Sequence, residues 1–400
     1  MPLATRCCLF TMIAIAAGCG ARTGLELAQP EGGNGTGGEG GAPPPSCVLT
    51  QLAGEIVLAG GEAVPQRAPQ LQELFDDIFF SRIALDPDAG QERLGRAVFA
   101  WADAWPPSVP FASQLGALCR AYVPYSGLAL IADPEGTPFW ASTNQTEPLL
   151  QLAVGEATPT FFDAASPTMF GGFTIAADSQ LYLVRISASF DFYDFRLDWG
   201  CGSTAVRASA IPWQDDFLVA LTSGTDFGGC GIPGGAAPAT RLQIARFTHD
   251  LEGDLLYEMD LGRSAHSLTL APRDGGAWLA VREDGEGAET TIDVYRLDEN
   301  GAPIAEPTVI DAHGVVSDGK VFDAAPMGER LVVSYRDDAT SRLTLQIVEA
   351  DGRLGANAVL NSADNGESSV LGKDDSVLLA YTTTGTPSQV HVARFECVAP

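Results

Sequence analysis

Short runs of alternating apolar and polar residues fill the chain after residue 46, and turn residues separate them. Runs such as "LALIADPEG" at 128–136, "DFRLDWG" at 194–200 and "VYRLDENG" at 294–301 lead into an acidic residue and then a glycine. Alternation at period two predicts β-strands, and Asp with Gly is typical of the turns between them. The pattern therefore predicts an all-β chain, in line with its 44 glycines and 26 prolines.

The same strand-and-turn unit recurs along the chain at intervals of roughly fifty residues, a spacing typical of repeat architectures. The recurring acids that we use as anchors are Asp86, Asp133, Asp198, Asp250, Asp298, Glu349 and Glu396. Units of several short strands at this spacing predict a β-propeller, in which each blade buries its faces against its neighbours. Seven anchors predict seven blades.

A second strand series supports this interpretation. Its members are "LYLVRIS" from Leu181, "DFLVALTSG" from Asp216, "AWLAVRED" from Ala277, "RLVVSYRD" from Arg330 and "VLLAYTTT" from Val377. Four of them follow a comparable lead-in, such as "ASAIPWQD" or "SLTLAPRDGG". The first unit is ambiguous, because "APQLQELFDDIFFSRIA" is also compatible with a helix from Gln70 to Ile83. We further expect the first ordered strand of the chain to complete the blade that contains 390–396.

Two turn segments resemble those of known propeller repeats. "ADPEGTPFW" at 132–140 resembles the turn of quinoprotein-type repeats, and "SADNGESS" at 362–369 resembles an Asp-box turn without its usual tryptophan. Each occurs once, so neither assigns a subfamily.

The N-terminus carries an export signal. Arg6 precedes an apolar run from Cys7 to Ala17, which is too short to cross a bilayer. The following "AAGC" resembles the lipobox of bacterial lipoproteins, and this resemblance implies that Cys19 is lipidated and becomes the mature N-terminus. Gly20 after the cysteine favours the outer membrane by the same resemblance. The alternative is an ordinary signal peptide with a chance cysteine.

These features divide the chain into a signal peptide at 1–18, a lipidated cysteine with a disordered tether at 19–46, and a propeller domain at 47–400. The tether contains "GGNGTGGEGGAPPP", which is too poor in apolar groups to pack and too rich in glycine to be rigid. We expect it to hold the folded domain near a membrane of the bacterial cell envelope while leaving it free to turn.

Five cysteines remain after the signal and the lipidation site, in a chain that has left the reducing cytosol. Cys47 opens the folded region and Cys397 lies near the chain end, so a disulfide between them is expected if the first and last strands meet. Their Cα atoms should then be roughly 4.4–6.8 Å apart. The pairing of Cys119, Cys201 and Cys230 stays open, since connectivity cannot be read from spacing.

The charge balance narrows the range of partners. The chain has 23 basic and 51 acidic residues. Nucleic acid is not expected as a partner, because its binding depends on neutralising phosphates with Lys and Arg. No cofactor is expected; calcium at turn carboxylates is a minor alternative, for which "LDPDAGQE" at 85–92 comes nearest but lacks a third carboxylate of the usual spacing.

A catalytic apparatus is not evident in the sequence. There is no nucleophile elbow, zinc spacing, phosphate loop or dinucleotide glycine pattern. Among the histidines, His266 and His313 lie between expected strands and are better candidates than His249 and His391. The sequence therefore favours a binding or scaffold module for a protein, glycan or envelope component. The alternative is an envelope hydrolase or lyase acting on a polysaccharide or small ester, because glycoside chemistry needs only two acids from distant blades.

Overall fold

The fold is that of a computed structural model of the 400-residue chain, and all described residues belong to the unit Pro44–Pro400. Side chains are described mainly from residue 208 onward. The described residues are 47–52, 56–57, 66–74, 77–86, 91–101, 111–114, 118–123, 128–132, 138–142, 150–151, 157–165, 168–175, 180–187, 193–199, 207–223, 240–248, 252–263, 265–284, 290–312, 322–337, 342–383 and 387–399. The expected signal peptide, Cys19 and the tether lie outside them.

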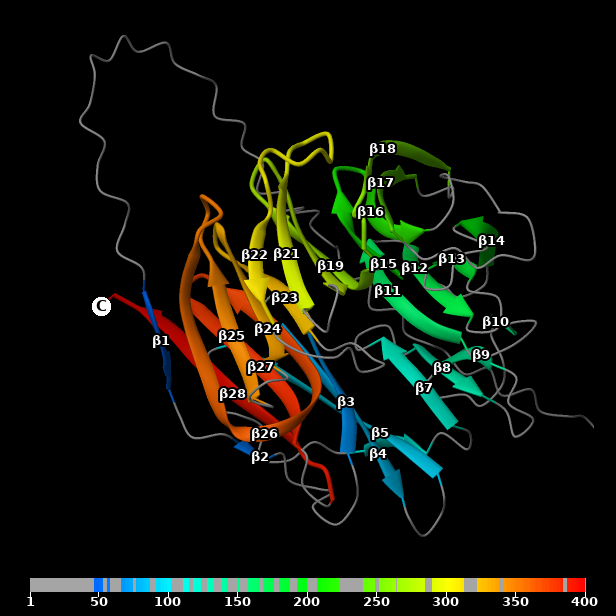
Figure 1. The fold of residues 1–400 in the computed structure, drawn as a ribbon. Coiled ribbons are helices and arrows are strands. Elements are labelled where there is room, and N and C mark those ends of the chain that lie inside the picture. Colours follow the sequence, from blue (N-terminus) through cyan, green and yellow to red (C-terminus); the bar gives the residue numbers. More distant parts are fainter. Residues whose placement is uncertain are drawn as a thin grey trace, which may run out of the picture. The chain divides into compact units, whose positions relative to one another are not determined.

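The described residues form an all-β fold, and its strands follow one another sheet by sheet along the chain (Figure 1). Five antiparallel sheets have four strands each. The first two comprise β3 (Gln66–Leu74), β4 (Asp77–Asp86), β5 (Gln91–Ala100) and β6 (Phe111–Gln114), then β7 (Leu118–Val123), β8 (Leu128–Ala132), β9 (Pro138–Ser142) and β10 (Leu150–Gln151). The third comprises β11 (Ala157–Ala165), β12 (Thr168–Ile175), β13 (Gln180–Ser187) and β14 (Tyr193–Trp199). The fourth and fifth comprise β15 (Arg207–Trp213), β16 (Asp216–Ser223), β17 (Arg241–Phe247) and β18 (Gly253–Asp260), then β19 (Ala265–Arg273), β20 (Gly276–Asp284), β21 (Thr290–Leu297) and β22 (Thr308–Asp311).

The remaining strands form one eight-stranded sheet with two halves that share a single long strand, β26 (Leu354–Lys373). The first part of β26 pairs with β25, and its last part pairs with β27. The other strands are β23 (Phe322–Met327), β24 (Arg330–Asp337), β25 (Arg342–Val348), β27 (Ser376–Thr383), β28 (Val390–Val398), β1 (Val48–Gln51) and β2 (Ile56–Val57). Each half therefore repeats the four-stranded arrangement, because β1 and β2 both pair with β28.

The second strand of each C-terminal unit is buried on both faces, which explains its nearly continuous apolar sequence. In β20, Trp278 packs with the next sheet along the chain, whereas Leu279 packs with the preceding sheet. In β27, Leu378 and Leu379 likewise face opposite neighbours. The hydrophobic core is thus divided into clusters, each lying between two consecutive sheets. Such sheets bury their faces only against their neighbours, which makes this fold a β-propeller.

A repeated side-chain hydrogen bond links the first strands of neighbouring sheets. Leu270 N–H donates to Ser209 Oγ at 2.9 Å, and Val370 N–H donates to Asp323 Oδ2 at 3.0 Å. Leu71 N–H donates to Ser369 Oγ at 3.1 Å and so joins β26 to β3, near the start of the described chain. Each acceptor lies four residues before the end of its strand. The position thus selects a short polar side chain in an otherwise apolar strand.

The two ends of the domain meet at β1 and β28, which lie side by side in Figure 1. Val48 pairs with Val398 and Gln51 with Phe395 in an antiparallel register. The expectation that the first ordered strand completes the sheet containing 390–396 is confirmed. The blade number of seven stays a prediction.

The sequence anchors are equivalent only in the second half of the chain. Asp298 and Glu349 follow β21 and β25, which are third strands, and Glu396 lies in the third strand β28. Asp86 instead ends a second strand, and Asp198 lies in a fourth strand. Asp133 and Asp250 are outside the described residues. The single register expected for all anchors is therefore wrong, because an acid before a turn marks the end of any strand, whatever its place in the sheet.

Two further segments have a different structure from the one that their sequence suggested. The possible helix from Gln70 to Ile83 is wrong, since β3 and β4 form a hairpin in which Leu74 pairs with Asp77. The Asp-box-like segment 362–369 is not a turn, because β26 runs through it as it passes from one half of its sheet to the other. "ADPEGTPFW" lies partly outside the described residues, since only Ala132, at the end of β8, and its last three residues, in β9, are described.

Candidate functional site

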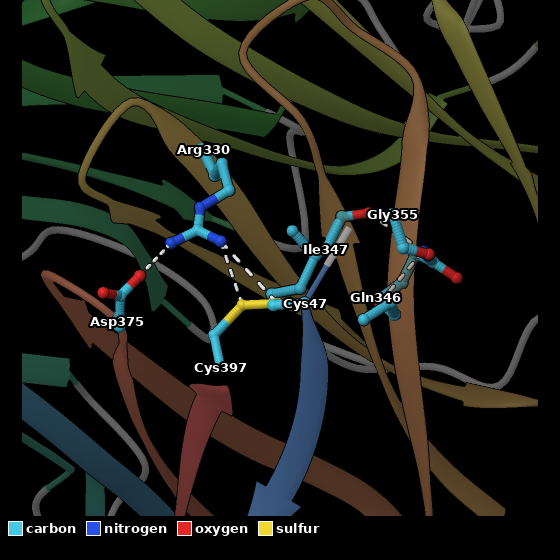
Figure 2. The surroundings of a disulfide bond; sticks show 8 residues. Cys47, Arg330, Gln346, Ile347, Gly355, Asp375 and Cys397 are labelled. Atoms are coloured by element: carbon cyan, nitrogen blue, oxygen red, sulfur yellow. Dashed lines mark hydrogen bonds and ion pairs between the residues drawn. A yellow bond between two sulfur atoms is a disulfide. The ribbon is translucent and has the colours of Figure 1, made fainter. Parts of the chain in front are cut away.

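The predicted cysteine pair lies where β1 meets β28. The structure joins Cys47 and Cys397 by a disulfide, with Cα atoms 5.2 Å apart and thus within the expected range. Figure 2 shows Arg330, at the start of β24, reaching this bond. Its Nη1 is 2.9 Å from Cys397 Sγ and 3.6 Å from Cys47 Sγ, while Nη2 is paired with the Asp375 carboxylate. The bond therefore closes the domain within a polar contact between its last two units.

The other candidate residues named from the sequence are not brought together into a described site. His249, His313, Cys201 and Cys230 lie outside the described residues. His266 and Cys119 belong to β19 and β7, but their side chains are not described. His391 lies in β28, with its ring 5.5 Å from that of Tyr381. Neither histidine that is placed on a strand is brought to a described group of catalytic residues.

The turn acids have a structural role where they are described. Asp298 Oδ1 accepts hydrogen bonds from the N–H groups of Asn300 and Ala302, and Gly301 in the same turn has a φ of 77°. This is the geometry that selects Asp and Gly in turns. Within the described part of the chain, no group of three or more His, Cys, Asp or Glu side chains could hold a metal ion.

Two buried carboxylates lie at the boundary between the β15–β18 and β19–β22 sheets. Glu283 near the end of β20 is 2% exposed, and Asp293 in β21 is 8% exposed. Cross-strand pairing places Glu283 opposite Thr291 and Asp293 opposite Val281, so both acids are on the face that packs on the preceding sheet. The partly exposed Arg263 approaches them, with its Nε 3.7 Å from Glu283 Oε2.

Burial alters the protonation of this pair. Loss of hydration and, to a smaller extent, the charge of Asp293 together raise the pKa of Glu283 to about 7, although Arg263 opposes the rise. The pKa of Asp293 is also raised by burial, against the lowering effects of Thr291 and Arg263. Burial and the two carboxylates raise the pKa of the adjacent Tyr295 as well. Glu283 therefore gains a proton as the pH falls through about 7.

The sequence contained a signal for the acid pair that we did not use. In "AWLAVRED", Glu283 is in phase with the apolar Ala277, Leu279 and Val281, so alternation places it on the buried face. Asp293 is similarly in phase with Tyr295 and Leu297. An acid on the apolar phase of a strand predicts a buried carboxylate.

A group of exposed apolar side chains lies on the outermost strands of three consecutive units and on the connection that leads into β22, and we call it the outer band. Their side chains are between 38% and 51% exposed, and they are Leu255, Leu256, Ile304, Val309, Leu354 and Val359. Leu255 and Leu256 project at a β-bulge, where the register of β18 shifts opposite Ile244 and Ala245. Bulges redirect side chains in this way, so two successive leucines face solvent.

Contacts between neighbouring units connect the members of the outer band. The turn at Gly301, which precedes Ile304, lies against Leu256: a Cβ added at Gly301 would be 3.4 Å from Leu256 Cδ1. Thr308, which precedes Val309, donates a hydrogen bond from Oγ1 to the carbonyl of Gly352, two residues before Leu354. Arg296 also donates from Nη1 to the carbonyl of Ala350 at 3.2 Å. These contacts place the members of the outer band on segments that neighbour one another, from β18 through the connection before β22 and β22 itself to β26.

The outer band lies in strongly acidic surroundings. The segments 252–260, 298–311 and 349–359 contain one basic residue, Arg353, and ten acidic residues. The acids are Glu252, Asp254, Glu258, Asp260, Asp298, Glu299, Glu306, Asp311, Glu349 and Asp351. Arg353 itself is paired with Asp351 at 2.6 Å. Two arginines of adjacent strands also reach this surface, since Arg241 lies 3.4 Å from Glu258 and Arg296 donates to the carbonyl of Ala350. The ten acids still outnumber these three arginines. The band thus combines exposed apolar groups with a negative field.

A search of the described residues finds no helix with the length and apolar character needed to cross a membrane. No known protein family matches the chain, and no curated protein matches its sequence.

Solved structures with a similar fold include propeller domains. The chain is 12% identical to the β-propeller domain of Myceliophteria thermophila Cps50 (Swd1), with a TM-score of 0.46 over 88% of this chain and 99% of that one. The propeller domain of the Trilobed protease from Pyrococcus furiosus, described as having an open velcro topology, is 9% identical, with a TM-score of 0.46 over 84% and 94%. A thermostable family-43 glycoside hydrolase is 12% identical, with a TM-score of 0.38 over 62% and 95%. Likeness at this level carries no inference about function.

Proposed function

We propose that the protein is a lipid-anchored β-propeller of the bacterial cell envelope that serves as a binding or scaffold module. The outer band is the observation that carries this proposal. Contiguous exposed apolar groups mark interaction surfaces in soluble domains, whereas single ones need no explanation. The Cys47–Cys397 disulfide supports the assignment to an oxidising compartment, because such bonds persist outside the cytosol.

The membrane anchor rests on the lipobox resemblance at Cys19. Cys19→Ala should move the protein from the membrane fraction to the soluble fraction, and the anchor is tested by fractionation together with mass spectrometry of the mature N-terminus. Unchanged membrane partitioning with a mature terminus at another residue would reject the anchor.

The binding function is tested by placing a photo-crosslinking amino acid at Ile304 in the full-length chain in cells. Ile304 is 49% exposed in the centre of the outer band. The matched control is the same substitution at Asp215, which is exposed in the turn between β15 and β16 and outside the band. Adducts at Ile304 that are missing at Asp215 are expected. Equal adducts at both positions, or none at Ile304, would contradict the proposal.

The alternative function, an envelope hydrolase or lyase, has one observation in its favour. Glu283 with its raised pKa resembles a general acid, and Asp293 provides a second carboxylate. Both side chains are, however, almost fully buried, and Arg263 already approaches Glu283. The structure therefore gives more support to binding than to catalysis. Polysaccharide cleavage or ester hydrolysis that Glu283→Gln abolishes in a folded protein would reverse this preference.

A further inference from the structure

We infer that the outer band binds a cationic surface of another protein, one that presents Lys or Arg side chains around apolar anchors. This inference rests on the proposed binding function and names the chemistry of the partner. The apolar members of the band supply contact area, and the surrounding acids determine which partner can approach. Such complementarity mainly sets specificity and the rate of association.

In the part of the chain that the structure describes, several acids near the band have no neighbouring basic side chain that neutralises them, so they can interact with a partner. Arg241 approaches Glu258 at 3.4 Å, and Asp351 is paired with Arg353. Asp298 accepts hydrogen bonds within its own turn. Asp254, Glu299 and Glu306 are exposed beside Leu255, the Gly301 turn and Ile304, and no salt bridge to them occurs among the described residues. These three carboxylates are therefore the best-placed to attract a cation.

The same charges disfavour the other occupants of an apolar surface. Anionic phospholipid headgroups would be repelled by the acids, as would nucleic acid. A second copy of this chain in a two-fold dimer would place identical acidic bands against each other. A cationic protein surface is the occupant that both features fit.

The test uses three labelled ten-residue peptides, of alternating Lys and Leu, Lys and Ser, and Glu and Leu, with binding to the folded domain followed by fluorescence anisotropy. We expect the Lys/Leu peptide to bind at least tenfold more tightly than either of the others. Its affinity should fall at least tenfold between 50 and 300 mM salt, because the attraction between exposed charges is screened. Equal binding of the Glu/Leu peptide, or of the Lys/Ser peptide, would overturn the inference.

Two variants assign the binding to the outer band. Asp254→Asn, Glu299→Gln and Glu306→Gln together remove three charges but little packing, and should weaken the Lys/Leu peptide at least tenfold. The control replaces Asp215→Asn, Glu329→Gln and Asp374→Asn, which removes the same number of charges from first-to-second-strand turns outside the band. Equal weakening in both variants would show general attraction to an acidic protein and overturn the inference.

Two further variants test the apolar side chains of the band. Leu255→Ser and Ile304→Ser should weaken the Lys/Leu peptide at least fivefold, while Leu52→Ser and Val398→Ser, at exposed apolar positions outside the band, should not. The crosslinking experiment separates this inference from the broader function. A partner captured at Ile304 through a neutral or acidic surface would reject the cationic chemistry and leave the binding function standing.

Discussion

Two boundaries between neighbouring sheets differ in how their charged side chains are placed. One lies between the β15–β18 and β19–β22 sheets. The other is the closure, where β26 meets β3. At the closure, Lys373 Nζ lies 2.7 Å from Glu73 Oε1, and both side chains are about one-third exposed. Trp101 adds a hydrogen bond from Nε1 to the same Glu73 oxygen at 3.1 Å. The other boundary buries two carboxylates, Glu283 and Asp293, with one arginine near them.

The difference shows how the two regions respond to their surroundings. A partly exposed pair of opposite charges contributes little because solvent screens it, whereas buried like charges make stability depend on their protonation. At the closure, the sheet that contains β26 is instead linked covalently by the Cys47–Cys397 bond, between the residue before β1 and β28. The closure should therefore be sensitive to reductant, and the acid-pair boundary to pH.

The largest expected effect comes from removing the disulfide. Cys47→Ser with Cys397→Ser opens a link between residues separated by 350 positions. Loop-closure entropy gives a loss of about 6 kcal/mol as an upper figure. Thermal unfolding should show a clearly lower midpoint with the β-rich circular dichroism spectrum retained. Recovery of the two cysteine peptides from non-reduced protein as separate, alkylatable thiols would contradict the bond itself.

The second prediction concerns pH and the acid pair. Because Glu283 has a pKa of about 7 in the folded protein and an ordinary value near 4.5 when unfolded, the folded state binds more protons between these values. The free energy of unfolding should consequently fall as pH rises through this window and level off above it. At about 1.4 kcal/mol per pKa unit, the total fall attributable to Glu283 is on the order of 3 kcal/mol.

Glu283→Gln keeps the shape and removes the titration. Urea unfolding at pH 5 and pH 8 should show that the variant loses less stability over this interval than the wild-type protein. The matched control is Glu306→Gln, an exposed carboxylate in the connection between β21 and β22 of the same sheet. An unchanged pH dependence in Glu283→Gln would refute the buried acid as its source.

Much of the fold could be predicted because it depends on signals local to one strand. Alternation in "AWLAVRED" and "RLVVSYRD" predicts strands correctly, and Cys47 and Cys397 mark the chain ends whose approach they stabilise. The register of the early units could not be obtained this way, since Asp86 and Asp298 look alike in sequence but end a second and a third strand. The outer band was also missed, because the contact between Leu256 and the Gly301 turn joins strands of different sheets.

The third prediction concerns a hydrogen bond from a backbone N–H to a serine side chain that occurs at both boundaries. Ser209 at the acid-pair boundary and Ser369 at the closure accept the same backbone hydrogen bond from the next first strand. Ser209→Ala and Ser369→Ala should each destabilise the protein by about 1–3 kcal/mol, because a buried N–H loses its partner. Similar losses in urea unfolding would show that the two boundaries differ only in their charges. A loss confined to one variant would show that the shared bond matters at one boundary alone.

The smallest effect is expected at the closure ion pair. Lys373→Met keeps most of the aliphatic stem but removes the charge that faces Glu73 and lies 6.0 Å from the centre of the Trp101 ring. Since an exposed pair contributes about 0–1 kcal/mol, the loss should be no greater than this and should shrink further at high salt. The matched variant Glu73→Gln also weakens the acceptor of the Trp101 N–H and should cost slightly more. Urea unfolding at low and high salt measures both. A loss in Lys373→Met as large as that from removing the disulfide would mean that the ion pair, rather than the covalent bond, dominates the closure.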